Sequence, residues 1–420
     1  MTMSLHTDEL AYKDVYEQYI DESSFLWLMY SIAVNQPHYN VHDLEKLEKR
    51  INSQLDGLMT AIDLSWEICE KSLELEDAGE VFTAAVIAFR SFDQVKIQKA
   101  VEAGFISDDC FKGLSSALLW LPDNLVHPWI KSFFTSKDVN HKYLALEACS
   151  LRRDDPAGFL ITLFQRDDCL AHANLYMTLL RITGELKRHD LIDYVEKAIS
   201  HDNDSIKFWA IWAAILLGKR DYVSMLEPYV FKAGNHQKEA IQIAFRVLPL
   251  EQSRQWVSRF VNEPDQLRNV IIATGILGDP HAVDWLLLKM RELNYARVAA
   301  ESFCMITGAD LEKMLMTIDA PEHVDDGPTD DPDDANVSMH DDENLPWPNV
   351  ELVASYWNGI RSRFIVGQRY LLGKPVELST LVPGLTTAYQ RQRHAIAYEI
   401  AMLDKSEKLI NTRSIVSRKY

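Results

Sequence analysis

The sequence has little of the patterning that marks membrane, secreted or β-sheet proteins. Its longest strongly apolar run, Phe208–Leu217, is far shorter than the roughly 20 apolar residues that a membrane-spanning helix needs. The first ten residues have no basic region followed by an apolar one, so we expect no signal peptide. Alternating Val, Ile and Thr residues are scarce, which argues against a sheet. We therefore expect a soluble, cytoplasmic protein with no membrane partner.

Cysteine is scarce too, and no pair of cysteines is spaced as a redox or metal motif. The five cysteines are odd in number and lie far apart in apolar helical patterns, so we predict small buried side chains in a reducing compartment. Cys169 and His172 have a zinc-like spacing, but no second pair follows at the usual distance. The sequence therefore predicts no metal site.

The sequence also lacks the residue sets that enzymes use. It has no Gly-rich phosphate loop, no paired catalytic carboxylates in a recognisable frame, and no histidine in a Ser/Asp or Cys/Asn set. We expect no catalytic residue, no cofactor, and no hydrolase, transferase or glycosylase turnover from the pure protein.

What the sequence does contain is a recurring pair of helices. In Asp204–Lys232, two amphipathic stretches are joined at Gly218, which ends a helix at low cost. Similar helix ends recur near Ser91, Pro122 and Arg152, and then at Gly184, Gly218, Pro249, Gly278 and Gly308, where the steps are 34, 31, 29 and 30 residues. Such a period predicts an all-α fold, an α-solenoid of HEAT-like helix pairs. A globular helical bundle is the alternative. Five residues before three of these ends lie small residues, which we expect at close helix crossings: Ala213, Ala244 and Ala273.

Composition divides the chain into four parts. Residues 1–75 are predicted to be an N-terminal helical cap that includes one long helix over 41–75, and residues 76–318 to be the HEAT-like repeats. Residues 319–348 hold eleven acidic and no basic residues, and we predict an acidic, Pro-containing linker. Residues 349–420 are predicted to be a basic C-terminal helical region.

Within the first part, Glu9–Asn35 is dense in aromatic and apolar side chains. We predict two helices here, the second beginning at Asp21 or Ser23. The cluster either covers the first repeat as a cap or forms an exposed patch for a partner. In the last part, GQRYLLGKP is predicted to be a loop.

Charge narrows the choice of partner. The net charge is −19, and the repeats alone hold 32 acidic and 27 basic residues, whereas a helical-repeat protein that grips DNA needs a basic face. We therefore expect no nucleic-acid partner.

Two groups of charged residues are candidate partner-binding residues. The acidic segment lies as a strap on the basic C-terminal helices, near Arg391 and Arg393, binds a basic partner, or is a solvated linker. The two arginines either bind an anion or form a solvated helix edge. The acidic candidates are Asp325, Asp326, Asp330, Asp331, Asp333 and Asp334.

Three stretches carry a resemblance to a known family. They are SSFLWLMYSIAVNQPHY near the N-terminus, SFCMITGADL followed by DDGPTDDPDD, and LPWPN through RYLLGKP to AYQRQRHAIAYEIA. Together they resemble an uncharacterised proteobacterial family of HEAT-like helical-repeat proteins, often encoded beside type VI secretion spike genes. The resemblance implies a cytoplasmic accessory role, and it brings no catalytic residues.

We therefore expect a non-enzymatic protein–protein interaction scaffold, an adaptor or chaperone for a type VI secretion effector or spike component. One alternative is an immunity-type protein that binds a toxin with its acidic surface. An alternative of another class is a nucleic-acid-processing helical-repeat enzyme such as a base glycosylase, which the charge disfavours. The oligomeric state is left open.

Overall fold

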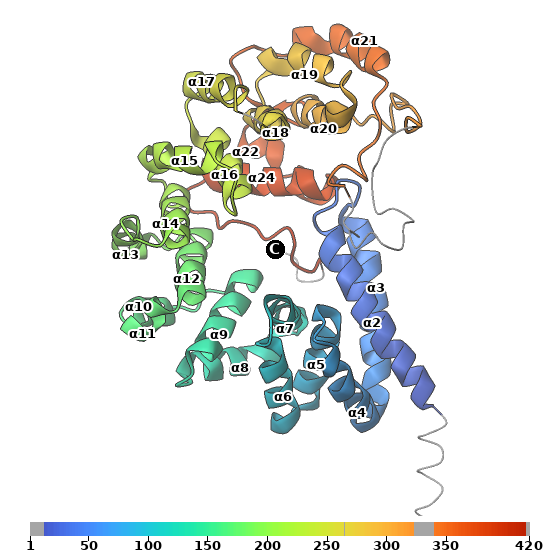
Figure 1. Cartoon of the computed structure of the whole chain (residues 1–420), viewed down its shortest axis with the longest axis vertical. Helices are drawn as coiled ribbons and strands as arrows, with labels where there is room; N and C mark the ends of the chain where they lie inside the picture. The colour runs from blue at the N-terminus through green and yellow to red at the C-terminus, as the bar shows by residue number, and fades with distance from the viewer. Residues whose placement is uncertain (1–11, 264, 323–339, 417–420) are drawn as a thin grey trace, which may run out of the picture. The chain divides into compact units, whose positions relative to one another are not determined.

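A computed structural model describes residues 12–263, 265–322 and 340–416 (Figure 1). The described chain is almost wholly helical, which confirms the predicted all-α, helical-repeat fold. Its contacts divide it into two compact units. Unit 1 comprises Met1–Tyr194 with Ile410–Tyr420, and unit 2 comprises Val195–Leu409. The boundaries that composition suggested, after residues 75, 318 and 348, do not coincide with this division.

Unit 1 begins with two long helices and continues with short helix pairs. In chain order the helices, with 3₁₀ turns marked η, are α2 (Lys13–Ala33), α3 (Val41–Leu58), η1 (Met59–Ala61), α4 (Ile62–Ser72), η2 (Leu73–Leu75), α5 (Ala78–Ser91), α6 (Gln94–Gly104), α7 (Asp108–Trp120), α8 (Asp123–Thr135), α9 (Val139–Arg152), α10 (Gly158–Phe164), α11 (Asp167–Ala171), α12 (Ala173–Glu185) and η3 (His189–Leu191). The boundary between the units falls inside α13 (Ile192–Ala198).

Two predictions for the start of unit 1 are wrong. The stretch predicted as two helices is the single helix α2, because Ser23 and Ser24 are buried, and the Ser24 hydroxyl bonds to that of Thr83 at 3.0 Å instead of capping a new helix. The long helix predicted over 41–75 ends at Leu58, and α4 begins only after Ala61, whose φ of −138° and ψ of 68° are not helical.

The first helices of successive pairs form a layer in unit 1. α5 packs on α7, α7 on α9 and α9 on α12, while α6 and α8 pack on the first helices beside them (Figure 1). α5 is apolar all round (VFTAAVIAF) and is buried along Val81–Phe89, because α2 and α4 cover it as well as its repeat neighbours. A helix that is apolar on every side needs cover on every side.

Unit 2 repeats the helix pairs and ends in a short hairpin and three helices. Its elements are α14 (Asp204–Leu216), η4 (Arg220–Leu226), α15 (Glu227–Phe231), α16 (Gln237–Val247), α17 (Leu250–Phe260), α18 (Leu267–Leu277), η5 (Pro280–Ala282), α19 (Val283–Lys289), η6 (Leu293–Tyr295), α20 (Ala296–Thr307), α21 (Val350–Ile360), η7 (Arg361–Arg363), β1 (Tyr370–Leu371), β2 (Lys374–Pro375), α22 (Leu378–Leu381), α23 (Gly384–Thr387) and α24 (Gln390–Leu403).

The predicted helix ends are found in the structure with one exception. Gly278 and Gly308 follow α18 and α20 directly, and Gly218 follows α14 after one residue, with φ values of +71°, +73° and +91°, a backbone conformation that glycine adopts without strain. Gly184 is the exception, because it lies inside α12, and Lys187 takes the left-handed conformation instead (φ +55°).

The predicted loop GQRYLLGKP is in fact a small antiparallel hairpin, β1–β2. Its backbone caps two helices that lie far away in sequence: the N–H of Tyr370 donates to the carbonyl of Gly278 at 2.8 Å, and that of Leu372 to Met305 at 2.7 Å. The last carbonyls of a helix have no partner within the helix, so the hairpin supplies one. A Cβ on Gly278 would lie 2.2 Å from the Tyr370 oxygen, so glycine is also required here for close approach.

The two ends of the acidic segment pair with each other. Thr317 and Pro348 form an antiparallel bridge, and the N–H of Ile318 donates to the carbonyl of Trp347 at 2.9 Å. The chain therefore leaves and re-enters unit 2 at one place. The segment joins two neighbouring stretches of one unit, and does not separate two folded parts.

We predict that one buried alanine of unit 2, Ala244, cannot be enlarged without loss of stability. Ala213, Ala244 and Ala273 are all fully buried, as their spacing suggested. Ala244→Leu adds side-chain volume where α16 meets α18, so we expect a loss of about 1–3 kcal/mol in the free energy of unfolding. Urea denaturation measures the loss, with Lys238→Leu, an exposed position of the same helix, as the control. An equal effect of the two substitutions would contradict the packing.

Candidate protein-interaction site

Helix α2 has two apolar faces, and the described residues cover only one of them. On the covered face, Trp27 stacks on Phe82 of α5 with ring centroids 5.1 Å apart, and the backbone of Ser24 comes so close to Gly79 that a Cβ there would lie 2.8 Å from the Ser24 oxygen. This face covers α5, the first helix of the first pair, as we predicted for an N-terminal cap.

The opposite face of α2 carries Phe25, Leu28 and Ile32, which we call the α2 stripe. Their spacing of three and four residues places them on one side of the helix, over its last turns. They are 60%, 41% and 52% exposed. Large apolar side chains scattered singly over a surface are ordinary, whereas a row on one helix face is the pattern that helix-to-helix recognition uses. The cap and the partner-binding patch are thus two faces of one helix.

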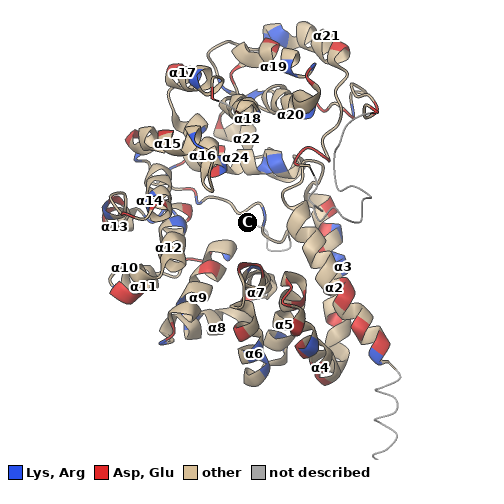
Figure 2. Ribbon diagram, in the orientation of Figure 1, with Lys and Arg blue, Asp and Glu red and all other residues tan. Residues whose placement is uncertain are grey.

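The part of α2 that precedes the stripe is acidic. The first half of α2 carries Asp14, Glu17, Asp21 and Glu22 and a single basic residue, Lys13, which pairs with Glu17 at 3.4 Å (Figure 2). A partner with an apolar row and basic residues beside it would complement this helix in shape and charge.

A carboxyl group at the junction of α2 and α5 has a displaced pKa. Burial raises the pKa of Glu80 from 4.5 to about 7, helped by a hydrogen bond that protonated Glu80 donates to the Asp77 carboxylate and by the negative charges of Asp77 and Asp21. Asp77 caps α5 through the N–H of Gly79 at 2.9 Å, so it is held close to Glu80. The α2–α5 junction therefore carries a proton at a pH where most carboxyl groups have lost theirs.

This displacement predicts a pH dependence of stability. Between about pH 4.5 and 7 the folded state binds more protons at Glu80 than the unfolded state does, so stability falls as pH rises through this window. Glu80→Gln cannot ionise. After allowance for solvent screening, we expect it to gain on the order of 1 kcal/mol relative to wild type on going from pH 4.5 to pH 8. Urea denaturation at both pH values measures this, with exposed Glu74→Gln as the control. If the free energies of unfolding of Glu80→Gln and wild type differ by the same amount at both pH values, Glu80 does not bind a proton in the folded state over this range.

The predicted partner-binding residues lie elsewhere. Asp325, Asp326, Asp330, Asp331, Asp333 and Asp334 fall outside the described residues, so their role stays a prediction. Arg391, at the start of α24, pairs with Glu301 at 3.0 Å and donates to the carbonyl of Asp341 at 2.9 Å. Arg393 is buried, and its Nε donates to the carbonyl of Leu385 at 2.7 Å. The structure brings Arg391 to the acidic segment and turns Arg393 into the protein.

The carboxylates at the described end of the acidic segment bind a different arginine. Asp342 is only 2% exposed and is held by both terminal nitrogens of Arg268, at the start of α18. Close by in sequence, the Trp347 ring lies under the guanidinium of Arg297. The Arg297 Cζ atom is 4.6 Å from the centroid of that ring. Neither arginine could be predicted from the sequence, because neither lies in the basic C-terminal region on which the strap was expected to lie.

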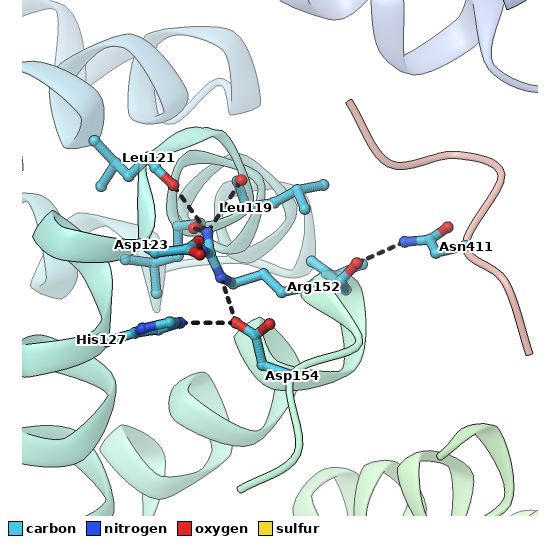
Figure 3. Close-up of polar contacts among 9 residues, drawn as sticks. Leu119, Leu121, Asp123, His127, Arg152, Asp154 and Asn411 are labelled. Carbon is cyan, nitrogen blue, oxygen red and sulfur yellow. Dashed lines mark hydrogen bonds and ion pairs between the residues drawn. The ribbon is translucent and has the colours of Figure 1, made fainter. Parts of the chain in front are cut away.

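A buried arginine closes the end of α7 in unit 1. The Arg152 side chain is fully buried and donates to the carbonyls of Leu118, Leu119 and Leu121 at 2.7, 3.2 and 2.9 Å (Figure 3). Its Nε donates to Asp154 at 2.8 Å, and it also pairs with Asp123. This cluster joins one repeat to the next by satisfying the end of a helix, which is a structural task.

One serine–histidine contact resembles a nucleophile–base pair. An equivalent contact in another repeat has asparagine in place of serine, and asparagine cannot act as the nucleophile of such a pair. His236 Nε2 lies 2.8 Å from Ser205 Oγ, and burial lowers the pKa of His236. His172 Nε2 lies 3.2 Å from Asn140 Oδ1 in the same relation, since each histidine precedes a first helix and contacts the start of the previous one, 31 or 32 residues earlier. We therefore assign both contacts to repeat packing.

Comparisons with family models, curated proteins and solved structures return no match to this chain. No helix among the described residues is both long and apolar enough to cross a bilayer. The described cysteines are free, and four of the five are buried.

Proposed function

We propose that the protein is a helical-repeat scaffold that binds a protein partner through the α2 stripe. The observation that carries the proposal is the exposure of Phe25, Leu28 and Ile32 on a helix whose other face is packed into unit 1. A helix fixed along one side offers its free side without an ordering cost at binding, and a row of large apolar side chains supplies the anchors that dominate interface energies.

The chemistry of the partner follows from α2. Residues 1–75 hold 14 acidic and 5 basic residues, so a partner with an amphipathic, basic helix is favoured over an acidic one. The resemblance to a family encoded beside type VI secretion spike genes supports an effector or spike component as that partner, with the protein acting as its cytoplasmic adaptor or chaperone. We propose no enzymatic activity.

The test is to purify the protein from its native host with its partners bound and to identify them. The proposal requires a protein that co-purifies at a fixed ratio with wild type and is lost when the α2 stripe is made polar. A partner retained at the same ratio by the stripe variant would refute the assigned surface, and a set of nucleic acids instead of a protein would refute the function.

A further inference from the structure

The last described residues of the chain belong to unit 1, although the helices before them belong to unit 2. After α24 the chain has no helix or strand as far as Val416, and Ile410–Tyr420 groups with unit 1. We call the described residues 410–416 the C-terminal arm. In the connection between unit 2 and the arm, Lys405, Ser406, Glu407 and Lys408 are exposed, and Leu409, next to the arm, is buried.

The first part of the arm caps a helix. The side-chain amide of Asn411 donates to the carbonyl of Leu151, in the last turn of α9, at 2.7 Å (Figure 3). The same residue's Oδ1 accepts the N–H of Arg413 at 3.1 Å, which makes a tight turn. Arg413 then donates to Asn35 Oδ1, just beyond α2, at 2.7 Å. The arm is thereby fixed to two elements of unit 1.

The second part of the arm binds a buried carboxylate. Glu48 of α3 is 4% exposed, and its Oε1 accepts the N–H of Val416 at 2.6 Å and the hydroxyl of Tyr30 at 2.9 Å. Tyr30 also reaches the carbonyl of Ser414 at 3.3 Å. Ile415 and Val416 are 7% and 8% exposed, so two apolar side chains are buried beside these polar contacts.

The groups that receive the arm are held in place by unit 1 itself. The Tyr30–Glu48 hydrogen bond lies between α2 and α3, and the Tyr30 ring packs edge-on against Trp120 of α7 at 5.4 Å. Tyr30, Asn35, Glu48 and the Leu151 carbonyl therefore form a preorganised arm-binding site, which recognises backbone and side chains of an extended peptide.

We propose that this arm-binding site accepts the C-terminal arm of a second copy of the chain in place of the chain's own, which gives an arm-exchanged dimer. Every contact of the arm described above is made with unit 1, so an exchanged arm loses none of them. The arm is also the peptide that the site is seen to fit. A tether gives the chain's own arm an effective concentration of about a millimolar, so exchange grows with protein concentration and is strongest when the chain's own arm is defective.

The test uses two full-length variants that are defective in complementary ways. In the first, Ile415→Asp spoils the arm and leaves the binding site intact. In the second, Glu48→Leu removes the acceptor of the site and leaves the arm intact. Mixed at about 100 µM, roughly tenfold below the effective concentration of a tethered arm, the two are expected to form a 1:1 heterodimer in sedimentation experiments, at least tenfold above the dimer fraction of either variant alone. A mixture that stays monomeric would overturn the proposal.

A second measurement does not depend on how well the Glu48 variant folds. A labelled peptide of residues 407–416 is titrated into the Ile415→Asp protein and into wild type, whose site its own arm fills. We expect the peptide to bind the Ile415→Asp protein at least tenfold more tightly than it binds wild type. As a control, a protein substituted at Lys408, in the exposed connection, should bind the peptide as weakly as wild type does. Equal, weak binding to both proteins would overturn the site. Peptide binding without a heterodimer would overturn the second copy as its occupant.

Discussion

Replacing Arg152 by leucine is expected to lower the free energy of unfolding of unit 1 by about 3–5 kcal/mol, because three buried carbonyls lose their hydrogen-bond donor at a cost of about 1–3 kcal/mol each. The guanidinium is fully buried and serves three carbonyls at the end of α7 and the carboxylate of Asp154. Leucine fills part of the space and donates no hydrogen bond, so the three carbonyls lose the donor that Arg152 supplies, whereas Asp154 keeps its contact with His127.

The control is an arginine with an ion pair at the surface. Arg166 and Asp168 pair at 2.6 Å with 43% and 47% of their side chains exposed, so Arg166→Leu should cost no more than about 1 kcal/mol. Urea denaturation followed by tryptophan fluorescence measures both variants. Similar midpoints for the two would show that the Arg152 cluster does not hold the repeats together.

Making the α2 stripe polar is expected to weaken partner binding by a factor of about 100 or more. Phe25, Leu28 and Ile32 each bury apolar surface in the proposed complex, and loss of two such anchors already exceeds about 3 kcal/mol. The triple change to serine leaves the covered face of α2 untouched, so the melting temperature should change little. Calorimetric titration with the purified partner measures the affinity.

The matched control removes exposed apolar side chains at another place on unit 1. Phe92 and Val95, between α5 and the start of α6, are 68% and 64% exposed, and their change to serine should leave the affinity within a factor of about three. If this control weakens binding as much as the stripe variant does, the partner does not select α2.

The parts of the fold that local chemistry decides were predictable from the sequence. Gly218, Gly278 and Gly308 end their helices because a left-handed residue is needed there and glycine supplies it, so the repeat period was visible in the chain. Gly184 shows the limit of that rule, since α12 continues to Glu185, whose carboxylate accepts a hydrogen bond from Ser150 and pairs with Arg153. The hairpin at Tyr370 was missed because its hydrogen-bond partners, such as Gly278, lie about ninety residues away.

The candidate site was predictable only in part. The aromatic cluster around Phe25 was recognised, but which face of α2 stays exposed depends on the contact between Trp27 and Phe82, which no local pattern reveals. The arginine that holds Asp342 was missed for the same reason, since Arg268 reaches it from 74 residues away. Spacing identifies a face, and only tertiary packing decides whether that face is covered.

The most direct measurement is site-specific photo-crosslinking in the native host. A photoreactive residue replaces Leu28 in the stripe or, in a second strain, Phe92. The proposed function predicts one protein partner crosslinked from position 28 and absent from position 92. A partner captured equally from both positions, or from position 92 alone, would contradict binding through the α2 stripe.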